Sequence, residues 1–145
     1  MNKRNMQAMG DFSIDAIPRT YDALPERVFR AWIDPASVKV WLAGGKNISI
    51  DPREGGLFYI EMPWQERIYP HYGRYLRVES PRLLEFTWVS EGSRGKESVV
   101  KIELTARGAK TELRLTHDGL PDEEQAKNHH GGWSGFLETL AERLR

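Results

Sequence analysis

The residues best suited to acid–base chemistry or metal binding are four histidines, His71, His117, His129 and His130. No H-x-x-x-H or H-E-x-x-H spacing occurs among them. The 145 residues include no cysteine, so a thiolate ligand or a cysteine nucleophile is excluded. No phosphate loop or cofactor fingerprint is present either. We therefore expect no metal and no cofactor. A general base is one reading of the histidines, and rim histidines with ordinary hydrogen bonds are the simpler reading.

Two of these histidines have apolar neighbours that suggest an orientation. His117 continues the alternation of Leu113 and Leu115, so it would share the inward face of a strand. His129 lies one helical turn before Trp133 and could face the same interior. Both are candidates for lining a binding site.

Arg74 is a candidate for an inward-facing charge. It alternates with Tyr72, Leu76 and Val78, which predicts a common face of one strand. A buried guanidinium would need a carboxylate, such as that of Glu61, or a ligand anion. A register shift of one residue would instead place Arg74 in solvent.

The composition excludes some classes of partner. Lysine plus arginine equals aspartate plus glutamate, at 21 each, so there is no basic excess to attract nucleic acid. No apolar run resembles a signal peptide or a membrane span, and we expect a cytoplasmic protein that binds neither nucleic acid nor membranes. Residues 1–10 are predicted to be a flexible arm, and residues 11–145 a single domain.

Alternating apolar residues predict about seven strands joined by short turns, which indicates antiparallel pairing. Each strand has one apolar face, so the sheet needs a cover on one side only. Tyr72, Leu76 and Val78 mark one of the strands. The others are marked by Phe12, Ile14 and Ala16; Ile48 and Ile50; Phe58, Ile60 and Met62; Leu84, Phe86 and Trp88; Val100, Ile102 and Leu104; and Leu113 and Leu115.

Helical spacing occurs after the first strand and at the end of the chain. Pro25 opens one short helix, and Asp34-Pro35 caps and opens a second. In "HHGGWSGFLETLAERLR" an apolar stripe starts at Trp133 and predicts a long terminal helix, the obvious cover for the sheet. The chain is therefore α+β.

Three glycines near the terminal stripe need an explanation: Gly131, Gly132 and Gly135. One reading is that they thin the helix where it crosses the sheet, which would allow close approach or leave room for a ligand. The other is that they mark a kink or a frayed start of the helix.

The segment "MPWQERIYPHYG", residues 62–73, breaks the strand pattern with two prolines and carries Trp64, Ile68 and Tyr69. We expect a loop with exposed apolar groups. It would be either a lid over a binding site or a homodimer contact.

Five segments together resemble a known family. They are "LPERVFRAWIDPASVKVWL", "DPREGGLFYI", "GRYLRVESPRLLEFTW", "TELRLTHDGL" and "GGWSGFLETLAERL". These segments, in this order, resemble those of the helix-grip superfamily (START or Bet v 1-like, SRPBCC). Within it, the chain resembles the branch related to the C-terminal domain of the Hsp90 ATPase activator. The resemblance implies a curved antiparallel sheet wrapped around a long C-terminal helix, with a cavity between them.

The resemblance also implies a function for that cavity, namely binding a small hydrophobic or aromatic molecule. Two alternatives stay open: a cyclase- or hydratase-like enzyme using the same cavity, and an Hsp90-activator-like interaction module. Trp32 and Trp41 would close one end of the cavity. The full set of candidate ligand-binding residues is Trp32, Trp41, Phe58, Ile60, Tyr72, Arg74, Phe86, Trp88, His117, His129, Gly132, Trp133 and Phe136.

Overall fold

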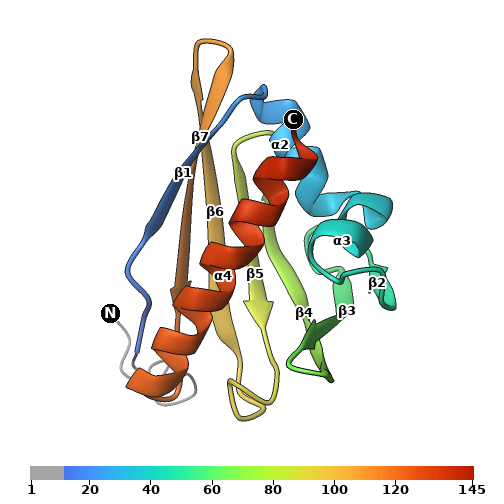
Figure 1. Cartoon of the computed structure of the whole chain (residues 1–145), viewed down its shortest axis with the longest axis vertical. Helices are drawn as coiled ribbons and strands as arrows, with labels where there is room; N and C mark the ends of the chain where they lie inside the picture. The colour runs from blue at the N-terminus through green and yellow to red at the C-terminus, as the bar shows by residue number, and fades with distance from the viewer. Residues whose placement is uncertain (1–11) are drawn as a thin grey trace.

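The computed structural model describes residues 12–145, and the arm predicted for residues 1–10 lies outside them. Seven strands form a curved antiparallel sheet in the order β1-β7-β6-β5-β4-β3-β2 (Figure 1). The chain therefore runs as a meander from β2 to β7, and β1 pairs with β7. The strands are β1 (Ile17–Tyr21), β2 (Ile48–Ile50), β3 (Leu57–Trp64), β4 (Arg67–Glu79), β5 (Leu83–Trp88), β6 (Ser98–Arg107) and β7 (Lys110–Asp118).

Two short helices follow β1, as predicted: α2 (Pro25–Ile33) and α3 (Pro35–Trp41). A proline opens each of them, where its missing N–H costs nothing. The Asp34 carboxylate accepts a hydrogen bond from the Ala36 amide at 3.2 Å, which confirms the predicted cap. Helix α3 lies beside β2 at one edge of the sheet, and α2 lies at one end of the sheet, where it contacts β6 and β7 (Figure 1).

The terminal helix α4 (Glu123–Arg143) lies across one face of the sheet (Figure 1). It begins well before Trp133, because Asp122 caps the amide of Gln125 at 2.8 Å and two glutamates occupy the first turn. Its stripe of buried residues is Ala126, Trp133, Leu137 and Leu140. The α+β helix-grip architecture predicted from the sequence is confirmed.

Residues 62–73 differ from the prediction, since they are strand and not loop. Strand β3 continues to Trp64, and strand β4 begins at Arg67. The two residues that join them, Gln65 and Glu66, both have positive φ (49° and 64°). Such a two-residue turn matches the right-handed twist of a hairpin. Pro63 is tolerated because Met62 to Trp64 extend beyond the short β2, and Pro70 because β4 pairs with β5 only from Tyr75 onward.

Strand β4 changes register partway along. Tyr75 pairs with Phe86 and Val78 with Leu84, so three steps on β4 match two steps on β5. This bulge between Tyr75 and Arg77 inserts one residue and reverses which side chains face inward.

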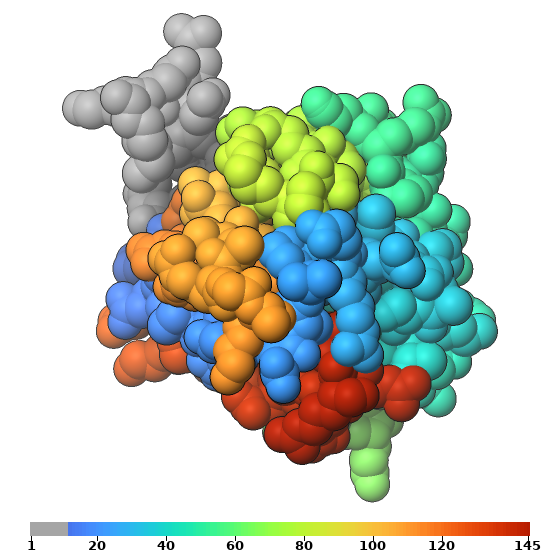
Figure 2. Space-filling model, turned by 90° about the horizontal axis from the view of Figure 1, so that it is seen from above, coloured from blue at the N-terminus to red at the C-terminus, as the bar shows by residue number. Residues whose placement is uncertain are grey.

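The core lies between the concave face of the sheet and α4. The Tyr21 hydroxyl donates to the Leu137 carbonyl at 3.0 Å in the buried interior and ties α4 to β1. At one end of the molecule, α2, the β4–β5 turn, the β6–β7 turn and the end of α4 lie together on the surface (Figure 2).

Candidate functional site

Aromatic rings fill most of the space between the sheet and the helices. Trp32 of α2 packs edge-on against Trp41 of α3, with ring centroids 4.8 Å apart. The Trp133 ring lies 6.1 Å from Trp32 and 5.0 Å from Trp88. Phe86 bridges Trp32 and Trp88 at 6.5 and 6.0 Å. These spacings are typical of packed aromatic clusters, and each of the five rings is at least nine-tenths buried.

A small apolar cavity remains within this cluster, between the α2–α3 pair and strands β3 to β5. Its volume is about 20 Å³, which is room for about one water molecule. The resemblance implied a cavity between the C-terminal helix and the sheet. The observed cavity lies instead between the α2–α3 pair and the sheet, no residue of α4 lines it, and the protein's own side chains almost fill it. Its lining residues are Trp32, Val38, Leu42, Phe58, Ile60, Tyr75, Phe86 and Trp88.

Two indole groups on the wall of this cavity have no hydrogen-bond partner. The Nε1 atoms of Trp32 and Trp88 are fully buried, and neither donates to any acceptor in residues 12–145. By contrast, Trp41 donates to the Ala31 carbonyl at 2.8 Å. A buried donor without an acceptor costs roughly 1–3 kcal/mol, so few native structures keep one without a reason.

His117 lies beside the cavity in a complete chain of hydrogen bonds. Trp133 Nε1 donates to His117 Nδ1 at 3.0 Å, so Nδ1 must be unprotonated and Nε2 must carry the proton. His117 Nε2 lies 2.8 Å from the Ser98 hydroxyl, and that hydroxyl donates to the Trp88 carbonyl at 2.7 Å. The imidazole is therefore neutral, with both nitrogens occupied.

The electrostatics agree with a neutral His117. Full burial lowers its pKa well below 6.5, and the nearby imidazoles of His129 and His71 add to the effect. Protonation of Nδ1 would set two N–H groups against each other at Trp133. His117 therefore positions Trp133 and Ser98 and has no free nitrogen to act as a general base.

His71 and His129 flank this network. His71 packs on Trp88 with ring centroids 4.7 Å apart, and burial lowers its pKa to about 4. His129 meets His117 edge-on at 5.1 Å, and burial lowers its pKa as well. Each donates through Nδ1 to a backbone carbonyl, of Tyr69 and Gln125 respectively. Residues 12–145 hold no group of three His, Cys, Asp or Glu side chains arranged to bind a metal.

Tyr72 and Arg74 point away from the interior, so the inward orientation predicted for Arg74 is wrong. Tyr72 is 49% exposed, and Arg74 is exposed and paired with Glu97 at 3.0 Å. That carboxylate raises the pKa of the guanidinium. The cause of the error is the bulge between Tyr75 and Arg77, which lets Val78 face inward although Tyr72 does not. His71 and Tyr75 occupy the inward positions instead.

Gly132 also faces away from the interior. A methyl group added at Gly131, Gly132 or Gly135 would meet nothing within 4 Å, so these glycines neither thin the helix against the sheet nor leave room for a ligand. The glycine that does permit close approach is Gly73 of β4. A Cβ there would lie 2.1 Å from the Thr87 carbonyl oxygen and 2.8 Å from the Phe58 ring.

The remaining candidates divide into two groups. Phe136 and His129 are partly buried at the edge of the cluster. The buried group is Trp32, Trp41, Phe58, Ile60, Phe86, Trp88, His117 and Trp133. Sequence reasoning did not assign Ser98 to the site, although its alternation with Val100 and Ile102 places it on the inward face. It also did not assign His71 and Tyr75 to the site. These residues alternate with Gly73 on one face of β4, and that glycine was the available sign that this face is closely packed.

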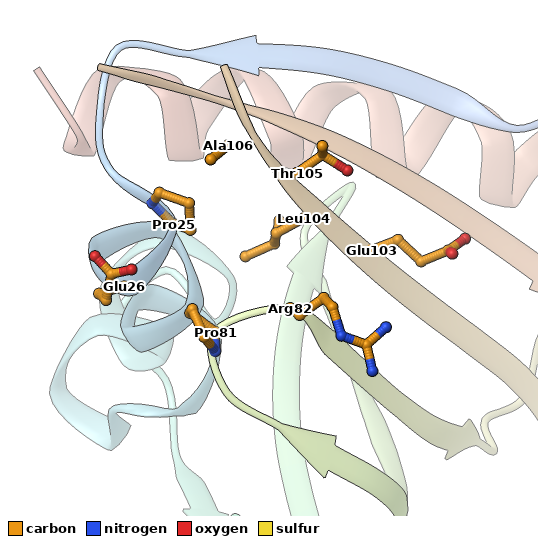
Figure 3. Close-up of a pocket in the computed structure, with 8 residues that line it drawn as sticks. All are labelled: Pro25, Glu26, Pro81, Arg82, Glu103, Leu104, Thr105 and Ala106. Carbon is orange, nitrogen blue, oxygen red and sulfur yellow. The ribbon is translucent and has the colours of Figure 1, made fainter. Parts of the chain in front are cut away.

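A larger groove of about 440 Å³ lies on the surface at one end of the sheet (Figure 3). It contains none of the predicted site residues and is open to solvent. Two of its three charged side chains are partnered with residues outside the groove, Arg82 with Glu79 and Glu103 with Lys101. We therefore place the candidate site in the interior. The groove is lined by Pro25, Glu26, Pro81, Arg82, Glu103, Leu104, Thr105 and Ala106.

The fold and the aromatic interior place the protein in the helix-grip class. The chain belongs to the family described as activator of Hsp90 ATPase homolog 1-like protein, whose profile matches residues 22–145. This confirms the resemblance seen in the sequence, including the wider START or Bet v 1-like superfamily. A comparison with curated proteins finds no match. Among residues 12–145, no helix combines the length and apolar character needed to cross a membrane.

Solved structures of similar proteins support the same assignment. CalU16 from Micromonospora echinospora is 31% identical, with a TM-score of 0.70 over 88% of this chain and 73% of its own. Mll3558 from Rhizobium loti is 28% identical, with a TM-score of 0.78 over 92% and 99% of the two chains. An Hsp90 activator from Plasmodium falciparum is 21% identical, with a TM-score of 0.76 over 91% and 95%, which shows a common fold only.

Proposed function

We propose that the protein binds a small hydrophobic or aromatic molecule between the α2–α3 pair and strands β3 to β5 of the sheet. The observation that carries this proposal is the apolar cavity, whose eight lining residues include five aromatic ones and no carboxylate, lysine, arginine or histidine. Binding pockets are mostly apolar and carry few polar groups. The site is therefore suited to an uncharged ligand.

The ligand must enlarge the cavity, because about 20 Å³ holds only one water molecule. We place this enlargement at α3, which has only seven residues and contributes Val38 at its centre. The turn after it contains Gly44 and Gly45, with φ of 56° and 86°, before β2 begins at Ile48. We infer that ligand binding selects a form in which α3 has moved outward.

The cyclase- or hydratase-like alternative needs a titratable group that can exchange a proton with the ligand. Both nitrogens of His117 are engaged, so this residue gives the enzyme alternative no support. His129 and Glu61 do not line the cavity either, and Tyr75 is the one titratable residue among the eight that do. Ligand binding without covalent chemistry is therefore the better supported proposal.

Ligand binding can be tested by truncating a side chain in the cavity wall and, as a matched control, a buried side chain elsewhere in the core. Ile60 lines the cavity, whereas Ile102 on β6 is equally buried and does not. We expect Ile60→Ala to bind small aromatic compounds more tightly than the wild type, because it removes volume from the wall, as engineered apolar cavities do. Ile102→Ala should bind them as the wild type does.

The measurement is tryptophan fluorescence and calorimetry with a panel of neutral aromatic compounds, together with native mass spectrometry of freshly expressed protein. Both variants should lose about 2–4 kcal/mol of stability, so their folding must be checked first. Failure of every compound to bind both the wild type and Ile60→Ala would contradict the proposal.

A second candidate is docking to an Hsp90-type chaperone, as the family description suggests. The observation that favours it is a group of exposed apolar residues on the outer face of β3 and β4: Leu57, Tyr59 and Tyr72. Tyr59 and Tyr72 are cross-strand partners. Calorimetry with purified Hsp90 tests this candidate. Binding by the wild type that is lost in Leu57→Ser and Tyr72→Ser, with ligand binding unchanged, would support it.

A further inference from the structure

Polar atoms are scarce in the wall of the interior cavity. Among its eight lining side chains, the only polar atoms are the indole nitrogens of Trp32 and Trp88 and the hydroxyl of Tyr75. An indole N–H can donate but cannot accept. Burial raises the pKa of Tyr75, so its hydroxyl stays protonated and neutral. The wall therefore offers mainly donors and no charge.

The two donors lack an acceptor although their neighbours have one. Trp32 and Trp88 are 5% and 2% exposed, and their Nε1 atoms donate to nothing in residues 12–145. In the same cluster Trp41 and Trp133 both have acceptors, the Ala31 carbonyl and His117 Nδ1. In this cluster, the two indole N–H groups that do not line the cavity have a hydrogen-bond acceptor. The two indoles that line the cavity have none.

We propose that the ligand is a neutral aromatic molecule carrying a hydrogen-bond acceptor, such as a ketone, quinone or ether oxygen, which is received by the indole N–H groups of Trp32 and Trp88. This inference rests on the proposed function and adds the chemical class of the ligand. A ligand acceptor would remove the cost of two buried, unpartnered donors. A charged ligand is disfavoured because no group of opposite charge lines the cavity.

A single water molecule would also fit in the cavity, so the test must separate a ligand acceptor from simple filling of the space. An apolar hydrocarbon that displaces such a water loses its hydrogen bonds, whereas a ketone of the same shape replaces them. The compounds 9-fluorenone and fluorene make this comparison possible. They are nearly the same size, but 9-fluorenone carries a ketone oxygen that can accept a hydrogen bond and fluorene does not.

We expect 9-fluorenone to bind the wild-type protein about tenfold more tightly than fluorene, as measured by calorimetry. The indole ¹H–¹⁵N resonances give a direct readout of the contact. On adding 9-fluorenone, the Nε1 protons of Trp32 and Trp88 should shift to lower field. Those of Trp41 and Trp133, already hydrogen-bonded, should shift much less and serve as internal controls.

Two kinds of variant remove the donors. Trp32→Phe and Trp88→Phe should lower the preference for 9-fluorenone while fluorene still binds. If either fails to fold, the same position can take β-(3-benzothienyl)alanine, which has sulfur in place of the indole N–H and nearly the same shape. Trp64→Phe is the matched control, because Trp64 is 57% exposed at the end of β3.

The outcomes separate the two proposals. Equal binding of 9-fluorenone and fluorene to the wild type would leave ligand binding intact and overturn the inference about the acceptor. A preference that survives removal of both indole N–H groups would overturn it as well. If neither compound binds and no other aromatic compound does, the proposed function fails and the inference fails with it.

Discussion

Trp133 and Trp88 have ring centroids 5.0 Å apart, yet their indole N–H groups lie in different environments. At the histidine end of the interior, formed by His117, Ser98 and Trp133, every side-chain nitrogen and hydroxyl has a partner. At the cavity end, formed by the eight lining residues, Trp32 and Trp88 keep unpartnered donors. Trp88 joins both ends, since its carbonyl accepts from Ser98 while its ring lines the cavity.

The difference between the two ends separates structural polar groups from those available to a ligand. A buried hydrogen-bond chain that is complete fixes one packing arrangement, and it has no capacity left for a ligand. An apolar wall with unpartnered donors gains stability only when an acceptor arrives. We infer that the histidine end holds α4 on the sheet and that the cavity end binds the ligand.

The largest effect is expected from breaking the histidine end. His117→Ala removes a fully buried ring and leaves the Trp133 donor without its acceptor, which should cost about 4 kcal/mol of unfolding free energy in urea denaturation. A double-mutant cycle with Trp133→Phe isolates the pair. The two losses should be non-additive by about 1 kcal/mol, and strict additivity would contradict the hydrogen-bond chain.

Acid should destabilise the histidine end together with His71 and His129, which flank it. The unfolded chain binds a proton on each histidine near pH 6.5, whereas folded His71 does so only near pH 4. Between these values the unfolded state binds more protons, so stability rises with pH and is lost as pH falls. His71 alone should account for about 3 kcal/mol by pH 4, with further losses from His117 and His129, whose pKa values are also lowered.

Urea titrations between pH 7.5 and 4 measure this slope. His71→Leu should reduce it, because it removes a buried imidazole whose pKa is lowered. A slope that is identical in His71→Leu and the wild type would show that His71 is not held neutral by burial.

A smaller effect is expected at the cavity end, from Gly73→Ala. The added methyl group would meet the Thr87 carbonyl at 2.1 Å and the Phe58 ring at 2.8 Å. Relief of this clash should cost about 2 kcal/mol and push Phe58 into the cavity, weakening the binding of aromatic compounds. Thermal unfolding and calorimetry measure the two effects. Unchanged binding in a folded Gly73→Ala protein would argue that Phe58 is not part of the wall.

Much of this arrangement could be predicted from the sequence, because apolar residues recur at alternate positions in β3, β6 and β7. Phe58, Ile60 and Met62 face inward as their period requires, and the proline-opened helices lie where expected. The orientation of Arg74 could not be predicted from the sequence. One inserted residue in β4 reverses which side chains face inward, and alternation alone does not locate a bulge. The cavity volume was also beyond reach, because it depends on how the rings pack and not on which rings are present.

The glycines of α4 give the smallest expected effect and the sharpest contrast with Gly73. Gly132 lies in the middle of α4 with open space where a side chain would be, so Gly132→Ala should raise stability by about 0.5–1 kcal/mol through helix propensity alone. It touches neither the histidine end nor the cavity end, and binding of aromatic compounds should not change. The measurement is urea denaturation beside a fluorescence titration. Destabilisation or altered binding would mean that α4 approaches another part of the chain at Gly132, and the contrast with Gly73 would then be lost.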